Sequence, residues 1–308
     1  MRPMLATAGP TGVAGARSVP DGTDWVHEVK WDGVRLLAET TPEGVSLTTR
    51  NGNVATAAWP DLVDVAPRRD LVLDGEVIAL NERGRPDFRT LAERMHVRSA
   101  QTARRLAARV PATYMVFDLL RLDGRDLTHR PLAERRQLLE GLDLGPWQVP
   151  ATYDDGRMLF DATRDQGLEG IVSKRLDSPY RPGERSRWWL KFAHRFRGSY
   201  VVGGWRPQTG TADRLAAVLV GEVTPDGLAY RGRVGSGLTG RTAVQLAQQL
   251  TPREASPFVD PVPAEDARGT FWVEPEVVVD VDTHGVGYQR LRQPSFQGVR
   301  ADLSPEDL

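Results

Sequence analysis

The sequence predicts an α+β protein with two domains, a mixed domain over residues 1–197 and a small β-barrel over residues 198–308. A chain of 308 residues usually forms two domains of ordinary size. Up to Arg197, short apolar strands alternate with stretches of helical spacing, a pattern typical of an α+β domain. After Arg197, several strands accompany one helical stretch, which favours a small barrel.

The mixed domain begins with a Gly- and Pro-rich stretch that predicts irregular structure up to Trp25. Apolar and β-branched residues predict strands at 25–31, 34–40, 45–50, 71–80, 113–120 and 169–175. Apolar spacing and breaker residues predict helices at 60–65, 88–95, 102–109, 132–145 and 155–167. In the second domain the same signals predict strands at 200–207, 214–223, 228–237 and 272–282, a turn at 225–227 and a helix at 241–250.

Composition excludes several kinds of site and location. The chain has no Cys, which excludes a disulfide scaffold, a Cys-zinc site and a thiol nucleophile, and fits a reducing cytoplasm. No apolar run approaches the roughly 20 residues that a membrane span requires, so we expect no membrane partner. With a net charge of −1, the chain would have to hold a nucleic acid through local Arg-rich patches.

Lysine is rare in this chain, and each lysine has informative neighbours. The 40 Lys and Arg residues include only three lysines, Lys30, Lys174 and Lys191. Codon bias toward Arg can explain the scarcity, but a guanidinium stays protonated and cannot replace an amine that must attack. Lys30 lies at a strand end within the segment EVKWDGVR, beside acids and a glycine, which suits a nucleophilic lysine.

Two acids lie within apolar strands and so need a partner. Glu76 belongs to LDGEVIAL and Glu169 to EGIVSKR. A carboxylate in an apolar strand requires either an ion pair or a metal ion. A structural salt bridge explains each acid equally well alone, whereas their occurrence together with Lys30 favours a reactive site.

Six short segments occur in a fixed order: KWDGVR, TRNG, LDGEVIAL, FDLL, EGIVSKR and WLK. Together they resemble motifs I, Ia, III, IIIa, IV and V of the covalent nucleotidyltransferases, which include ATP-dependent DNA ligases, RNA ligases and mRNA capping enzymes. Residues 200–206 and 290–302 resemble the OB domain of bacterial end-joining DNA ligases. The resemblance implies a ligase/capping-type nucleotidyltransferase domain followed by an OB-fold barrel.

The resemblance also implies a role for each matching residue. Lys30 would attack the α-phosphate of ATP and carry AMP, while Mg²⁺ or Mn²⁺ would be held by Glu169 and Glu76. The other positions would bind the nucleotide: Glu28 the adenine edge, Phe117 the adenine ring, Arg35 and Glu76 the ribose, and Arg50, Lys174 and Lys191 the phosphates. These residue types suit the groups that they would contact.

Two motifs depart from the family pattern. Motif V usually reads Lys-x-Lys, but here the second position is Ala193, and His194 or Arg195 is expected to take over its phosphate contact. The last motif usually ends Arg-x-Asp-Lys, but here Leu303 replaces the lysine. Since this motif orients the leaving pyrophosphate in the family, slow self-adenylation is expected.

The resemblance implies an ATP-dependent DNA ligase that seals 3′-OH/5′-phosphate nicks through a lysyl-AMP intermediate in DNA repair, recombination or end joining. Its partners would be nicked duplex DNA and end-joining or repair proteins, and it would act as a monomer on the nucleoid in the cytoplasm. One alternative is an RNA ligase of the same superfamily. Another is a non-catalytic, degenerate ligase that binds ends, which the two missing lysines favour and the intact Lys30, Glu76 and Glu169 oppose.

Two other conspicuous pairs have simpler interpretations. Trp188 and Trp189 are expected to be a packing anchor near the domain junction. Arg135 and Arg136, within a helical stretch, are expected to form a solvated face.

Overall fold

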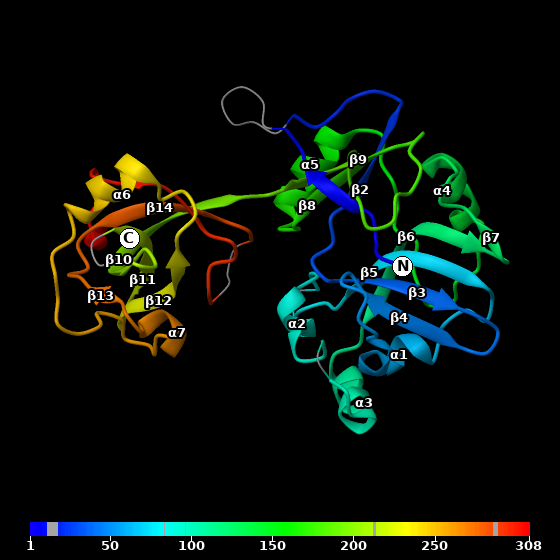
Figure 1. Cartoon of the computed structure of the whole chain (residues 1–308), viewed down its shortest axis with the longest axis horizontal. Coiled ribbons are helices and arrows are strands. Elements are labelled where there is room, and N and C mark those ends of the chain that lie inside the picture. The colour runs from blue at the N-terminus through cyan, green and yellow to red at the C-terminus, as the bar shows by residue number, and fades with distance from the viewer. Residues whose placement is uncertain (11–17, 83, 96, 212–213, 286–288) are drawn as a thin grey trace. The chain divides into compact units, whose positions relative to one another are not determined.

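The computed structural model describes residues 1–10, 18–82, 84–95, 97–211, 214–285 and 289–308. The chain divides into two compact units, Met1–Ala193 and His194–Leu308 (Figure 1). The division falls four residues before the boundary expected after Arg197, and strand β10 (Phe196–Pro207) crosses that expected boundary. The exact domain boundary stays a prediction. No helix of the described residues is long and apolar enough to cross a membrane.

The first unit contains two sheets, each with its own strand order. One sheet has the order β1-β9-β8-β2, with β1 at Leu5–Ala8, β2 at Trp25–Val29, β8 at Gly170–Arg175 and β9 at Arg185–Ala193. The other has the order β4-β3-β5-β6-β7, with β3 at Val34–Thr40, β4 at Val45–Thr49, β5 at Leu71–Ile78, β6 at Thr113–Leu122 and β7 at Arg125–Asp126.

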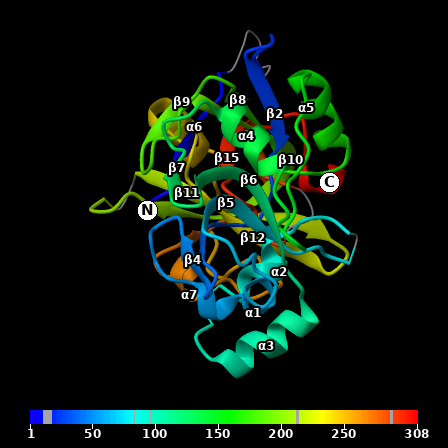
Figure 2. The ribbon, with the colours of Figure 1, turned by 90° about the vertical axis from the view of Figure 1, so that its right-hand side faces the viewer.

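Helices accompany both sheets, and an apolar cluster lies between the sheets. The helices are α1 (Pro60–Val63), α2 (Phe88–Ala92), α3 (Ala100–Arg109), α4 (Leu132–Glu140) and α5 (Gly156–Asp165). Helix α4 packs beside β6, and α5 packs on β8 and β2 (Figure 2). Between the sheets, Met4 and Trp189 from one side meet Leu37, Val72 and Leu120 from the other. This cluster joins the two sheets of the first unit.

The second unit is a curled antiparallel sheet. Its order is β12-β11-β10-β14-β15, with β11 at Leu215–Thr224, β12 at Gly227–Val234, β14 at Val278–Thr283 and β15 at Ser295–Val299, while β13 (Phe271–Trp272) pairs with β10. A bridge from Ser236 to Ser295 brings the two edges together, as expected for a small barrel. Two helices accompany it in the described residues, the expected α6 (Gly240–Ala247) and the short α7 (Ala264–Ala267).

The prediction of irregular structure before Trp25 is wrong for residues 5–8. These residues form β1, which pairs in parallel with β9, from Leu5 opposite Arg185 to Ala8 opposite Lys191. Four residues between prolines and glycines carry too short a pattern to indicate a strand, and the partner lies far along the chain. The part of the same prediction that concerns residues 11–17 lies outside the described residues.

Candidate functional site

A cavity of about 540 Å³ opens between the two sheets of the first unit. Its lining includes eight of the nine residues that the sequence analysis selected, namely Glu28, Lys30, Arg35, Arg50, Glu76, Phe117, Lys174 and Lys191. The ninth, Glu169, contacts Lys30 directly. Segments that are far apart in the sequence therefore meet at one place.

Lys30 lies just after β2, where the chain leaves the sheet. Its Nζ is 2.5 Å from Oε1 of Glu169, and its backbone N–H donates to the carbonyl of Gly170. Gly33 then has to be a glycine, because a Cβ there would lie 2.1 Å from the carbonyl oxygen of Val77. The glycine of motif I thus lets the chain pass close to β5 and brings Lys30 beside the acids.

Glu76 lies on β5, close enough to Lys30, Arg35 and Glu169 for their charges to act on it. Burial raises the pKa of Glu76 to about 8, although Lys30 and Arg35 act to lower it. No cluster of three or more metal-ligating side chains occurs among the described residues. Two neighbouring carboxylates nevertheless fit a Mg²⁺ or Mn²⁺ ion, because such ions take one or two carboxylates and complete their shell with substrate phosphates and water. A bound dication would also favour the ionised form of Glu76.

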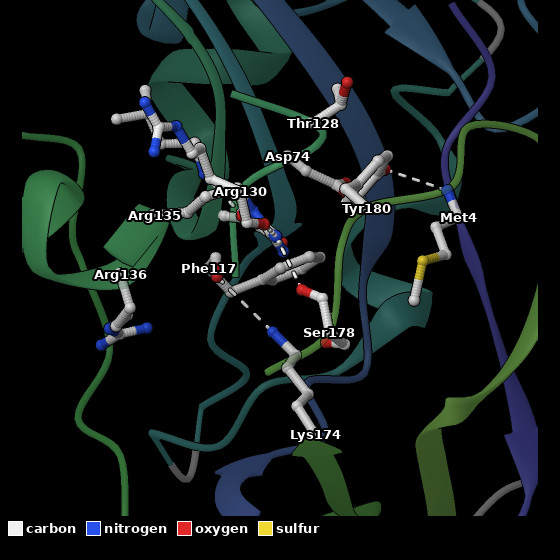
Figure 3. A network of polar contacts seen from close by, with 12 residues as sticks. Met4, Asp74, Phe117, Thr128, Arg130, Arg135, Arg136, Lys174, Ser178 and Tyr180 are labelled. Carbon is white, nitrogen blue, oxygen red and sulfur yellow. Dashed lines mark hydrogen bonds and ion pairs between the residues drawn. The ribbon is translucent and has the colours of Figure 1, made fainter. Parts of the chain in front are cut away.

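Arg35 is held by a network that runs back to Met4, just before β1. Its guanidinium donates to both carboxylate oxygens of Asp74, at 2.9 and 2.5 Å. The hydroxyl of Tyr180 donates to Asp74 at 2.6 Å and accepts from the backbone N–H of Met4 at 2.9 Å (Figure 3). Burial and Asp74 raise the pKa of Tyr180, so its hydroxyl remains a donor at neutral pH. The network fixes Arg35 with its guanidinium carbon 5.3 Å from the centre of the Phe117 ring.

The inner end of the cavity combines charge with aromatic rings. Lys174 is fully buried, and its Nζ lies 2.7 Å from Oε2 of Glu28. The same nitrogen is 4.4 Å from the centre of the Phe117 ring and 4.4 Å from that of Trp189. The phosphate role expected for Lys174 therefore stays a prediction, with a carboxylate and two rings as its neighbours here.

Three other cations of the cavity have no carboxylate partner among the described residues: Arg50, Arg185 and Lys191. Burial lowers the pKa of Lys191, and the nearby charges of Lys30, Arg185 and Arg50 lower it further. Arg185 donates to the carbonyl of Ala6 at 2.5 Å. Glu169 acts on Lys191 in the opposite sense, but none of the three cations forms an ion pair among the described residues, and their combined charge suits a polyanion.

Several residues of the site were not predicted from the sequence. Asp74 lies within the segment LDGEVIAL, but no function was predicted for it. No function was predicted for Tyr180 or Arg185 either. Trp189 is buried, as expected for a packing anchor, but it also lines the cavity. Arg185 lies on β9, six residues before Lys191. Its proximity to a selected lysine was the only feature of the sequence that could have indicated it.

The expectation of a solvated face for Arg135 and Arg136 is wrong, because both are buried. Arg135 donates to both carboxylate oxygens of Asp118 at 2.8 Å, and to the carbonyls of Arg130 and Ser178 (Figure 3). Asp118 lies in the middle of β6, where a carboxylate needs a cation, and α4 provides one.

The two departures from the family pattern lie in different units. Ala193, at the end of β9, pairs with Gly170 beside Glu169. His194 and Arg195 belong to the second unit, so their compensation for the missing lysine stays a prediction. In the last motif, Arg300 donates to Asp302 at 2.8 and 2.7 Å and lies 3.4 Å from Asp280.

Comparisons with known proteins identify the family of this chain. The family model "ATP dependent DNA ligase domain" matches residues 3–192, and "ATP dependent DNA ligase C terminal region" matches residues 211–303. The Mycobacterium tuberculosis protein named "Multifunctional non-homologous end joining DNA repair protein LigD" is 37% identical over 317 residues, which cover 100% of this chain and 39% of that protein. The chain therefore spans well under half of that relative.

A shorter relative and two solved structures resemble the chain over most of their length. DNA ligase C1 of Mycolicibacterium smegmatis is 32% identical, with 97% of this chain and 86% of that protein covered. The structure described as mycobacterial DNA ligase D complexed with ATP and MES has a TM-score of 0.57 at 35% identity, with 100% of this chain and 97% of that chain covered. The ligase domain of Mycobacterium tuberculosis LigD has a TM-score of 0.53 at 36% identity, with the same coverage. The first unit is of the nucleotidyltransferase type, and the second is a barrel of the OB-fold type. Together with these matches, they show that the chain belongs to the ATP-dependent DNA ligase family.

Proposed function

We propose that this chain seals nicks in duplex DNA between a 3′-hydroxyl and a 5′-phosphate, with ATP as the energy source. The observation that carries the proposal is the position of Lys30. It lies beside Glu169 in a cavity that also holds three cations without carboxylate partners among the described residues. A family relative in solved form is described as complexed with ATP, which supports the same ligand here.

The first step transfers AMP to the protein. The deprotonated Nζ of Lys30 attacks the α-phosphorus of ATP, a P–N bond forms, and the bond from that phosphorus to the pyrophosphate oxygen breaks. In the second step the 5′-phosphate of the nick displaces Lys30 and receives the AMP. In the third step the 3′-hydroxyl attacks that phosphate, the phosphodiester bond forms and AMP leaves.

Different residues of the cavity would bind different parts of ATP. Glu28 accepts from the adenine amine, and Phe117 provides a ring face for the base. Arg35 and Glu76 hold the ribose. Arg50 and Lys191 contact phosphates, and Arg185, which lines the same cavity, adds a charge that compensates in part for Ala193. Each of these assignments is supported by position and chemical type.

Glu76 and Glu169 would hold a Mg²⁺ or Mn²⁺ ion. Such an ion offsets negative charge on the phosphates as the bonds change. The side chains of this site contribute separately: Lys30 supplies the nucleophile, and the surrounding cations hold the triphosphate in line.

We further propose that the partner is nicked or broken duplex DNA, gripped through phosphates, and that the protein acts as a monomer on the nucleoid. The name of the LigD relative refers to non-homologous end joining and DNA repair, which supports end-joining proteins as partners. An RNA ligase remains the alternative substrate class. A degenerate, non-catalytic end binder is disfavoured by the assembled site around Lys30.

Labelling of the chain with α-labelled ATP and Mg²⁺ or Mn²⁺ tests the proposal. The wild-type chain should acquire label that survives denaturation, and Lys30→Arg should not, because a guanidinium cannot act as the amine nucleophile. Sealing of nicks with DNA strands, RNA strands and a single 3′-ribonucleotide separates the substrate classes. An unlabelled wild-type chain, or a labelled Lys30→Arg variant, would contradict the proposal.

A further inference from the structure

Lys174 is enclosed at the inner end of the cavity. It extends from β8 toward Phe117, and Nζ lies 3.5 Å from the backbone carbonyl of Phe117 (Figure 3). Oε2 of Glu28 at 2.7 Å and two aromatic rings, each centred 4.4 Å away, complete its surroundings. All of these neighbours favour a cation, through an ion pair and two cation–π contacts.

Glu28 uses only one of its two carboxylate oxygens in these contacts. Oε2 pairs with Lys174, whereas Oε1 has no hydrogen-bond partner among the described residues, although Glu28 is only 4% exposed. The nearest cation on that side is Arg136, whose guanidinium nitrogen is 3.6 Å from Oε1. Arg136 donates to Glu140 and to the carbonyl of Pro150 through its other two nitrogens, while the nitrogen that faces Oε1 has no hydrogen-bond partner among the described residues. A buried acceptor left unsatisfied is costly, so a ligand that offers a donor to Oε1 gains binding energy.

Lys174 is poorly suited to a phosphate contact. To reach a phosphate, Nζ would have to leave Glu28 and both rings, and the buried carboxylate would then lose its partner. Burial also lowers the pKa of Lys174, so that its charge depends on the carboxylate beside it. Three other cations line the same cavity and form no ion pair with a carboxylate among the described residues: Arg50, Arg185 and Lys191. Each could therefore contact a phosphate without breaking an ion pair.

We propose that Lys174 is a positioning residue that selects the nucleobase, and this inference rests on the proposed use of ATP. Lys174 anchors Glu28 through Oε2, which leaves Oε1 available as an acceptor. A 6-amino purine offers an N–H donor to Oε1, whereas a 6-keto purine offers an oxygen that the carboxylate repels. Without Lys174, Oε2 loses its charged partner and the carboxylate can turn toward Arg136, whose guanidinium nitrogen lies 3.6 Å from Oε1, so that the preference is lost.

Self-adenylation with ATP and with inosine triphosphate measures this preference, because the two nucleotides differ at the position-6 group and carry the same phosphates. The ratio of kcat/KM for ATP to that for inosine triphosphate should favour ATP in the wild type. Lys174→Met should lower the ratio by about tenfold or more, which corresponds to about 1.4 kcal/mol. Lys174→Arg, which keeps the charge, should restore part of it.

A matched control and a double variant separate positioning from phosphate binding. Lys191→Met removes another cation of the same cavity and should lower both kcat/KM values while it leaves their ratio unchanged. In a Glu28→Gln background, Lys174→Met should change the ratio no further, since it acts through Glu28. A wild-type ratio in Lys174→Met, or independent effects of the two substitutions, would overturn the inference.

Two outcomes need separate treatment. If Lys174→Met does not fold, Lys174→Gln is the second variant, because an amide can donate to Glu28 but carries no charge. An unchanged ratio of the two kcat/KM values in Lys174→Gln would also overturn the inference. If the wild-type chain is not labelled at all, the proposed function fails. Equilibrium binding of the same two nucleotides by calorimetry then gives the ratio directly and still decides the role of Lys174.

Discussion

Replacement of Arg135 by Met should destabilise the first unit far more than a typical loss of a charged residue. Arg135 and Asp118 are both fully buried, and two N–H groups of Arg135 donate to the two oxygens of Asp118. The substitution leaves that carboxylate uncompensated in the core, together with the carbonyls of Arg130 and Ser178. Removal of one partner from a buried pair costs about 3–5 kcal/mol.

For a unit of this size, each kcal/mol lowers the melting temperature by about 2–4 °C, so Arg135→Met should lower it by about 6–20 °C. Differential scanning calorimetry of the whole chain measures this shift. The double variant Asp118→Leu/Arg135→Met should recover most of the loss, because it leaves no buried charge. Arg104→Met is the matched control, since Arg104 pairs with Asp64 at the surface of α3 and should change little. A shift in Arg135→Met no larger than that of Arg104→Met, or a double variant as unstable as the single one, would refute this reasoning.

Further expectations concern the chemistry, the DNA contact and the acid stability. Sealing of a supplied pre-adenylated nick should survive Lys30→Arg better than the complete reaction does, because the last step does not use that amine; equal losses in both assays would count against it. Ala193→Lys should leave adenylation by labelled ATP unchanged or raise its rate by up to about tenfold, and a large loss would show that the pocket is built around a small residue. Affinity for nicked duplex should fall at least about tenfold between 50 and 200 mM salt in a titration, and a salt-independent affinity would argue against phosphate contacts. Burial lowers the pKa of His27 below 6.5, although Asp155, Asp21 and Asp154 oppose the effect. As the pH falls, His27 takes up its proton in the unfolded chain before it does so in the folded one. Its contribution to the free energy of unfolding should therefore be undiminished above about pH 6.5 and should decrease as the pH falls through the pKa of His27 in the folded chain. His27→Gln should flatten that part of the profile in denaturant titrations.

The candidate residues of the site were selected mainly by the resemblance of six short motifs to those of a known family. Residue chemistry alone indicated only a nucleophilic lysine, Lys30, and two acids in apolar strands, Glu76 and Glu169. Eight of the nine selected residues line one cavity, and the ninth contacts the nucleophile. The family and the two-part fold that these motifs implied are confirmed by the comparisons.

The partners of these residues could not be predicted, because they depend on distant pairing. Nothing near Lys174 in the sequence indicates that Glu28, almost 150 residues earlier, lies 2.7 Å away through the pairing of β2 with β8. Arg135 appears on a helix as a surface charge, and only the tertiary position of Asp118 explains its burial. Strand β1 was missed for the same reason, since its partner comes at the end of the unit.

The pairing of β1 with β9 has a consequence for the order in which this protein folds during synthesis. Leu5 is synthesised before its partner Arg185, which follows only after most of the first unit has been made. Contacts between residues so far apart in sequence form slowly, because a long loop must close first. Leu5, Ala6, Trp189 and Lys191 all line the cavity, so the wall of the site is completed only by the last strand. A nascent chain that stops before β9 would lack this wall and would not bind ATP. Binding of ATP would therefore indicate that the first unit has completed its folding.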